Sequence, residues 1–360
     1  MKILIIRPMA KEIRLDSYNC QELGLAKGFL DCGHDCDILF YSNINKEILI
    51  PYNNKNIKIY YRTGKIKFAI NGFFDKIDDL LEKYDYLQVN EINQLQSIEI
   101  LKNYDNSYVY HGPYKNKYDS IRHKIFDFLN DINLKCVLKN KNVNVFCKSS
   151  LAEEYISKFN CNTKVIGVGL DYSKFKREVS ETNLNKFNIL YVGKIEKRRN
   201  IVFMLKVVNK LIKYDNRYNL TIIGQGEKKY KGKIINLIRK LKLQNNVNII
   251  EFVDQNDISK YYEQSFVFLL PTNYEIFGMV LLESVFFGTP VLTTYNGGSS
   301  VIKQGIIVKK LKVKDWVDCI IALKETNYDR ETMNSYIINN FSWKNLAQNI
   351  IDELKQRRPE

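Results

Sequence analysis

The 360-residue sequence predicts an α/β protein made of two domains, each built around a doubly wound parallel sheet. Short apolar runs rich in β-branched residues alternate with amphipathic stretches along the chain, as in parallel sheets joined by helical crossovers. The length exceeds one ordinary hydrophobic core and suits two domains of about 150 to 180 residues. A single polar interruption near the middle of the chain marks the connection between them.

The first series of strands ends before residue 170. Strands are expected at 3–6, 36–41, 57–61, 86–89, 108–110, 143–147 and 164–168. Amphipathic stretches between them, at 21–30, 73–81 and 151–159, are expected to form helices. We therefore expect a first domain over residues 1–170.

The same alternation resumes after a polar stretch, Gly169–Glu181, which lacks a periodic apolar side and is typical of an interdomain connection. Strands are expected at 187–192, 220–223, 247–252, 267–270, 291–294 and 305–308. We expect the second domain over residues 182–341, so that two Rossmann-like sheets follow in tandem. Residues 342–360 show helical spacing after a Ser342 cap and predict a terminal helix.

Composition narrows the class of protein without choosing its ligand. The chain is 45% hydrophobic and 26% charged, which excludes a disordered or fibrous protein. Lys and Arg exceed Asp and Glu by 55 − 40 = 15, so the surface attracts phosphates, nucleic acid or an anionic membrane. Seven cysteines without a CxxC pair favour reduced, buried thiols over disulfides or a zinc site. No apolar run reaches the roughly 18 residues of a membrane span and no cleavage site follows the amino terminus, so a cytoplasmic protein is expected.

The stretch Pro271–Gly298 carries two carboxylates, Glu275 and Glu283, with seven residues between them. It predicts the end of a strand, a polar turn with Glu275, and a helix that begins after Phe277 and closes at Gly288. Such a turn lies at the carboxyl edge of a parallel sheet, where ligands bind. The first backbone N–H groups of the helix favour an anion such as a phosphate; they belong to Gly278, Met279 and Val280.

A basic turn follows the strand that ends near Tyr191. Four cations occur within six residues directly after Gly193; they are Lys194, Lys197, Arg198 and Arg199. Cations at the carboxyl end of a strand can hold a diphosphate. A solvated basic loop is the alternative for an arbitrary run of this kind, but the position directly after Gly193 favours the phosphate site.

The stretch Pro271–Gly298 resembles the donor-site signature of the retaining nucleotide-sugar glycosyltransferases of family 4. The resemblance depends on two acidic residues with seven residues between them, a Phe-Gly pair within that gap, and the Gly-x-Pro and Gly-Gly segments that follow. The segment Val168–Phe175 is similar to the family's interdomain crossing. This resemblance implies the GT-B fold: two Rossmann-like domains facing a central cleft, the first binding the acceptor and the second the nucleotide sugar. It also implies that the terminal helix crosses back to the first domain.

The resemblance also implies roles for the residues that match. Glu283 would hold the ribose hydroxyls and Glu275 the hydroxyls of the donor sugar, while Lys194 with Arg198 or Arg199 would bind the diphosphate. Lys194 stands where the family usually has Arg, which keeps the charge but loses the bidentate fork. The backbone of Phe277–Val280 would hold the sugar and the phosphate.

Three weaker candidates complete the expected site. Gly224, in a Gly-x-Gly turn, and Val253 would line the base and ribose by the same resemblance, although a tight turn alone explains the glycines. His111 follows a first-domain strand; it is either a structural histidine or, as in the family, faces the donor sugar. The first loop would place its polar residues near the acceptor and donor; these are Ser17, Tyr18 and Asn19.

Residues 114–129 mix Lys, Arg and His with aromatic and aliphatic residues at helical spacing. Such a helix can lie on an anionic membrane, where a lipid-linked acceptor would be found. An ordinary amphipathic helix with a charged outer side is the favoured alternative.

We therefore expect a retaining glycosyltransferase that moves a sugar from a nucleotide diphosphate sugar, with UDP favoured, to a glycan or lipid-linked acceptor in bacterial surface polysaccharide biosynthesis. No metal or other cofactor is expected. An epimerase or a phosphorylase of the same fold is the nearest alternative. A nucleic-acid-binding protein is disfavoured because the cations are spread along the chain without a recognisable motif. A catalytically silent binder of sugar nucleotides is disfavoured by the intact Glu275, Glu283 and basic turn.

Overall fold

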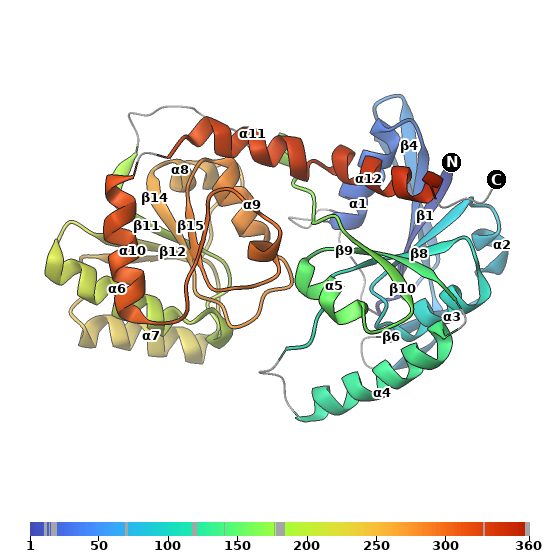
Figure 1. Cartoon of the computed structure of the whole chain (residues 1–360), viewed down its shortest axis with the longest axis horizontal. Helices are drawn as coiled ribbons and strands as arrows, with labels where there is room; N and C mark the ends of the chain where they lie inside the picture. Colours follow the sequence, from blue (N-terminus) through green and yellow to red (C-terminus); the bar gives the residue numbers. More distant parts are fainter. Residues whose placement is uncertain are drawn as a thin grey trace. The chain divides into compact units, whose positions relative to one another are not determined.

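The computed structural model describes residues 1–10, 13, 15, 20–68, 71–116, 121–139, 141–175, 177, 184–326 and 328–356. The chain divides into two compact units (Figure 1). Unit 1 comprises Met1–Asp171 together with Phe341–Glu360, and unit 2 comprises Tyr172–Asn340.

Unit 1 contains a sheet in the order β10-β9-β8-β7-β1-β2-β4-β3. Every neighbouring pair is parallel except β3 and β4, so β3 is an antiparallel edge strand. The strands are β1 (Lys2–Arg7), β2 (Asp35–Tyr41), β3 (Lys46–Tyr52), β4 (Lys55–Arg62), β7 (Tyr86–Asn90), β8 (Ser107–His111), β9 (Val143–Cys147) and β10 (Cys161–Val165). A separate hairpin pairs β5 (Gly64–Phe68) with β6 (Asn71–Phe74).

Several elements of unit 1 differ from the sequence prediction. The helix predicted over 73–81 is wrong: β6 continues to Phe74, and only α2 (Asp78–Leu81) is helical. Lys76 between them has a φ of +50°, in the left-handed region, which interrupts a helix. The last strand lies three residues earlier than predicted, and β3, β5 and β6 were not predicted at all.

The helices of unit 1 are α1 (Gln21–Asp31), α2, α3 (Leu95–Asn103), α4 (Ile121–Leu138), α5 (Ser150–Ile156) and α12 (Trp343–Gln356). α12 packs along α1, as Figure 1 shows, and buries one apolar side. A Cβ atom on Gly28 of α1 would lie 2.3 Å from the carbonyl oxygen of Trp343. Glycine at this position therefore lets the two helices approach closely.

Unit 2 contains a parallel sheet in the order β13-β12-β11-β14-β15-β16. Its strands are β11 (Asn185–Val192), β12 (Asn219–Ile223), β13 (Val247–Ile250), β14 (Ser265–Leu270), β15 (Val291–Thr293) and β16 (Ile306–Val308). Its helices are α6 (Ile201–Tyr214), α7 (Lys228–Lys240), α8 (Ile258–Glu263), α9 (Met279–Phe286), α10 (Val313–Glu325) and α11 (Arg330–Phe341), the last residue of which belongs to unit 1. The strand order reverses between β11 and β14, and ligands of doubly wound sheets bind outside the carboxyl ends of strands at such a point.

None of the described helices combines the length and the apolar character needed to cross a membrane. All seven cysteines are free thiols, and three of them, Cys20, Cys36 and Cys147, are buried. The expectation of buried thiols therefore holds for these three, whereas Cys136 is exposed and the others are half-buried.

Candidate functional site

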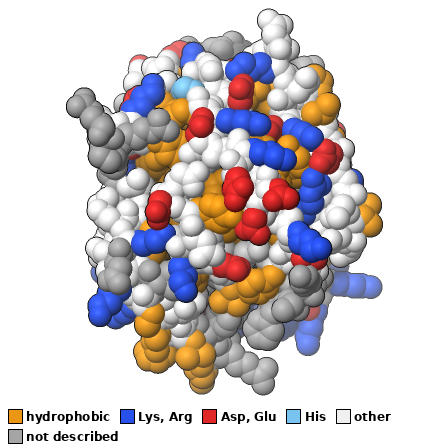
Figure 2. Space-filling view, turned by 90° about the vertical axis from the view of Figure 1, so that its right-hand side faces the viewer, with side chains coloured by type: hydrophobic (Ala, Val, Ile, Leu, Met, Phe, Trp, Pro, Cys, Tyr) orange, Lys and Arg blue, Asp and Glu red, His pale blue; other side chains and the backbone are white. Residues whose placement is uncertain are grey.

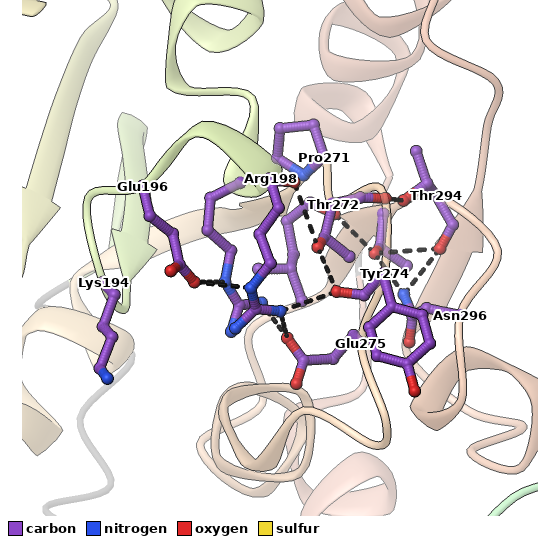
Figure 3. A network of polar contacts seen from close by, with 12 residues as sticks. Lys194, Glu196, Arg198, Pro271, Thr272, Tyr274, Glu275, Thr294 and Asn296 are labelled. Carbon is purple, nitrogen blue, oxygen red and sulfur yellow. Dashed lines mark hydrogen bonds and ion pairs between the residues drawn. The ribbon is translucent and has the colours of Figure 1, made fainter. Parts of the chain in front are cut away.

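Two turns meet at the point where the strand order of unit 2 reverses. One follows β11 and includes the short 3₁₀ helix η3 (Lys197–Arg199), and the other follows β14 and carries Glu275. The N–H of Asn273 donates to the carbonyl of Arg198 at 2.9 Å. The Asn200 side-chain amide donates to the carbonyl of Pro271 at 2.8 Å. These bonds join residues more than 70 positions apart and fix the basic turn against the acidic one (Figure 3).

Two guanidinium groups converge on the carboxylate of Glu275. Arg199 forms an ion pair with Oε2 of Glu275, and Nη1 of Arg198 lies 3.3 Å from the same oxygen. Arg198 also donates to the carbonyl of Tyr274 at 2.7 Å and pairs with Glu196 at 2.7 Å. The side chains of Glu275 and Arg199 are only 13% and 11% exposed, whereas Arg198 is 39% exposed. The structure thus brings together three of the residues that the sequence analysis selected.

Lys194 lies on the same turn but apart from this network. Its side chain is exposed and lies apart from Glu275 at the left of Figure 3, with no dashed contact to the network. The Tyr191 hydroxyl donates to the Lys194 carbonyl at 2.7 Å, which fixes the backbone of the turn while leaving the ammonium group in solvent. The lysine that stands where the family usually has Arg is therefore the most exposed of the three cations expected at the diphosphate.

The turn after β11 and the turn after β12 are in contact at Gly193 and Gly224. Gly193 and Gly224 have φ angles of +146° and +148°. A Cβ atom on Gly224 would lie 2.0 Å from the carbonyl oxygen of Gly193. Glycine at 224 is thus required by packing, independently of any nucleotide. Val253, in the segment after β13, is half-buried.

A Gly-Gly turn supports the acidic turn. The N–H of Gly297 donates to the carbonyl of Glu275 at 3.0 Å. A Cβ atom on Gly297 would lie 1.8 Å from the carbonyl oxygen of Ile276, so only glycine allows this approach. Gly278 then adopts a φ of +84° as the cap of α9, and Phe277 beside it is buried. Met279 and Val280 form the half-buried start of the helix.

Glu283 lies in the middle of α9 and is 2% exposed. Its Oε2 accepts a hydrogen bond from the Tyr262 hydroxyl of α8 at 2.9 Å. The Tyr262 ring stacks on Phe287 with the ring centroids 5.3 Å apart. The structure therefore holds the second carboxylate against α8 by a buried hydroxyl, a partner that the sequence did not reveal.

Unit 1 contains a second set of charges, at the carboxyl ends of β7, β8 and β9. His111 is fully buried, and its Nδ1 lies 3.2 Å from Oε2 of Glu91. Lys148 contacts the other carboxylate oxygen of Glu91 at 2.6 Å, and the N–H of Gly112 donates to Oε2 at 2.9 Å. Burial would raise the pKa of Glu91, but Lys148 and His111 outweigh it, and the pKa lies below its usual range. Sequence analysis missed Glu91 and Lys148, although Lys148 directly follows a predicted strand and Glu91 lies two residues after one.

A half-buried ion pair lies at the end of β1 in the same unit. Nη1 of Arg7 contacts Oε1 of Glu22 at 2.6 Å, and the Asn90 amide donates to the same oxygen at 2.8 Å. Burial raises the pKa of the Glu22 carboxyl, but Arg7 and further contacts lower it by more. Ser17, Tyr18 and Asn19, which were expected nearby, lie outside the described residues.

Comparison with known proteins connects this geometry to a family. Residues 173–343 match the family described as Glycosyl transferases group 1. A glycosyltransferase of Methanocaldococcus jannaschii, itself of uncharacterised activity, is 26% identical over 230 residues, which cover 57% of this chain and 58% of the relative. The chain thus spans little more than half of that relative's length.

Solved structures extend the likeness to both units. Sucrose-phosphate synthase of Thermosynechococcus elongatus has a TM-score of 0.70 at 16% identity, with 99% of each chain covered. The HepE protein of Anabaena, in complex with UDP and glucose, has a TM-score of 0.66 at 15% identity, again with 99% of each chain covered. Residues 173–343 thus match the group 1 glycosyltransferases, and the chain has the GT-B fold. The predictions of family and fold class are confirmed.

The sequence-predicted residues divide into three sets in the structure. Arg198, Arg199 and Glu275 form one contact network, and the Gly193 and Gly224 turns lie beside it. Glu283 is fixed separately by Tyr262, and His111 belongs to the charge network of unit 1. The described part of the chain has no group of three or more His, Cys, Asp and Glu placed to hold a metal ion.

Proposed function

We propose that this glycosyltransferase moves a sugar from a nucleotide diphosphate sugar to a hydroxyl acceptor with retention of the anomeric configuration. The observation that carries the proposal is the convergence of Arg198 and Arg199 on Glu275 at the point where the strand order reverses. This edge of a doubly wound sheet is where ligands bind. A site with two guanidinium groups and a carboxylate suits a ligand with both phosphate oxygens and sugar hydroxyls.

The cations would stabilise the leaving group. As the glycosidic bond breaks, negative charge grows on the diphosphate, and fixed cations stabilise that charge more in the transition state than in the ground state. Arg198 and Arg199 are already ordered by Glu275 and Glu196, so little reorganisation is needed. Lys194 is exposed and able to reach toward the phosphates. The backbone N–H groups at the start of α9 add to the positive field, so no metal is required.

The carboxylates would bind hydroxyl groups. Glu275 would accept hydrogen bonds from the donor sugar, and Glu283 from the ribose. The bond between C1 and the diphosphate oxygen breaks, and the acceptor oxygen bonds to C1 on the same side. The acceptor's proton passes to the departing phosphate oxygen. His111 would present its Nε2 to the donor sugar, since Glu91 contacts Nδ1.

UDP is the proposed nucleotide because the structurally similar HepE protein was solved with UDP and glucose. A glycan or a lipid-linked sugar is the proposed acceptor, and bacterial surface polysaccharide biosynthesis in the cytoplasm is the proposed context. Unit 1 would bind the acceptor and unit 2 the nucleotide sugar.

A thermal-shift panel of UDP-, GDP-, ADP- and TDP-sugars tests the donor. A ligand that binds only the native state at one hundred times its Kd adds about 2.7 kcal/mol of stability. We expect a UDP-sugar to raise Tm and the shift to be lost in Arg199→Ala. A panel without any shift would contradict the proposed donor class.

Product analysis separates this proposal from its nearest alternative. Transfer requires an acceptor and gives a glycoside with the donor's anomeric configuration. An epimerase would change the donor without an acceptor, and a phosphorylase would require free phosphate. Either of those results would replace the proposed reaction while leaving the donor site in place.

A further inference from the structure

Helix α4 carries apolar side chains on two opposite sides. Leu134 and Leu138 are fully buried in the hydrophobic core of unit 1. Other large apolar side chains of the same helix are between 47% and 77% exposed; they are Ile121, Ile125, Phe128, Leu129 and Ile132. Helix α4 includes residues 121–129 of the stretch 114–129 that showed helical spacing. It exposes an apolar side to solvent as well as charged residues.

The exposed residues follow the spacing i, i+4, i+7, i+8 and i+11, which places them in one row along the helix. We call this row, Ile121 to Ile132, the α4 stripe. At 1.5 Å per residue it is about 16 Å long. Figure 2 shows hydrophobic side chains gathered along the lower edge of the view, at the level of α4 in Figure 1. Contiguous exposed apolar surface of this kind marks an interaction site.

The charged side chains of α4 that the structure describes are arranged by sign. Lys124 and Lys135 are exposed and, by helical spacing, lie along one border of the α4 stripe. Asp127 and Asp131 are half-buried on the side toward the core. Asp131 accepts a hydrogen bond from the Tyr155 hydroxyl at 2.6 Å and pairs with Lys115. The outward surface of the helix is thus apolar with a basic border, and its acids are held inward.

We propose that the α4 stripe docks on a membrane leaflet that contains anionic lipid, with the helix parallel to the surface. The apolar row enters the boundary between headgroups and acyl chains, and the lysines meet the lipid phosphates. A net charge of +15 adds long-range attraction to such a surface. A lipid surface fits better than an acidic protein groove because the row is long and straight and has cations on its border. The proposal stands apart from the transfer reaction, since vesicle binding needs neither donor nor catalysis.

Flotation of the full-length protein with phosphatidylcholine vesicles, with and without phosphatidylglycerol, tests the proposal. The wild type should float with the anionic vesicles. The double variant Phe128→Ser/Leu129→Ser should lower the partition coefficient at least tenfold. Leu49→Ser on β3 is the matched control, because Leu49 and Phe128 are both 60% exposed, and it should float like the wild type. Lys124→Gln/Lys135→Gln should lower partition by about fivefold for each lysine.

Three results would overturn the proposal. The first is wild-type protein that stays unbound with both kinds of vesicle. The second is equal flotation of the wild type and Phe128→Ser/Leu129→Ser, provided that circular dichroism shows both folded. The third is a wild-type dimer in size-exclusion chromatography that this variant converts to a monomer without any vesicle binding, which would make a second copy the occupant of the α4 stripe.

Discussion

The carboxylate of Glu91 lies 3.2 Å from Nδ1 of His111, and Lys148 contacts the same carboxylate at 2.6 Å. Glu91 directly follows β7 and has a φ of +69°, a left-handed conformation that is uncommon for a residue other than glycine. Its contacts with His111, Lys148 and the N–H of Gly112 hold it in this conformation. A strained backbone and a buried charge therefore coincide at one position, at the end of a strand where function is often found.

Stability should depend on pH through Glu91. Its folded-state pKa is lower than the ordinary value of 4.5, so its contribution is complete above that value and is lost as pH falls below it. Lys148→Met removes the strongest opposing charge and should cost about 3 kcal/mol at pH 7, because the largely buried carboxylate then keeps only its contacts with His111 and the Gly112 N–H. Denaturant unfolding from pH 7 to pH 3 measures both effects.

The variant should also lose less stability than the wild type as pH falls below 4.5, since its Glu91 titrates closer to the ordinary value. Glu91→Gln in the Lys148→Met background should recover part of the loss at pH 7. Parallel pH profiles for the wild type and Lys148→Met would show that Lys148 does not set the pKa of Glu91.

Gly224→Ala should destabilise unit 2 by about 2 to 4 kcal/mol, through the strain of a φ of +148° and the clash with the Gly193 carbonyl. Gly232→Ala on α7 is the control, because nothing lies within 4 Å of a Cβ atom there. That change should instead stabilise by about 0.5 to 1 kcal/mol, as alanine favours a helix. Thermal unfolding of both variants checks the signs, and equal effects would remove the packing argument for Gly224.

Trp343 fixes α12 to unit 1, since Cβ atoms on Gly24 and Gly169 would each lie 2.3 Å from its ring. Trp343→Ala should cost about 3 to 5 kcal/mol, whereas Lys344→Ala, at an exposed position, should change little. Gly24→Ala should be strongly destabilising alone and much less so beside Trp343→Ala, because the clash is then gone. Strict additivity in this double-mutant cycle, measured by denaturant unfolding, would argue against direct contact of Gly24 with the ring.

Local sequence patterns were sufficient to predict features that follow directly from the geometry of a parallel sheet. Residues that follow parallel strands reach one edge of the sheet, so the turns with Arg199 and Glu275, after β11 and β14, could be placed at the same edge from the sequence. The same rule applied to Glu91 and Lys148 in unit 1, but the order in which β7, β8 and β9 pair is set by long-range contacts. Without that order, neither residue could be assigned to His111.

Other features depend on side-chain directions or on tertiary context. The outward direction of Lys194 and the Tyr262 partner of Glu283 follow from packing that no local pattern records. The end of β6 replaced the start of the helix predicted over 73–81, because Phe73 and Phe74 suit a strand as well as a helix. On α4, buried and exposed apolar rows lie on one helix, so hydrophobic periodicity could not tell which side faces the core.

The basic turn should govern turnover as well as donor binding. Arg199→Ala removes the cation paired with Glu275 and should lower kcat by about 10² to 10³, the usual loss when one donor to a developing charge is removed. Lys194→Ala and Glu275→Ala should each lower kcat by orders of magnitude while the fold survives. Lys197→Ala is the matched control, since Lys197 is exposed on the same turn, and it should change kcat by less than about threefold.

Release of nucleoside diphosphate from the donor found in the thermal-shift panel gives kcat and KM, and circular dichroism checks the fold. Rates near wild type for both Lys194→Ala and Glu275→Ala would mean that the reaction takes place elsewhere on the chain.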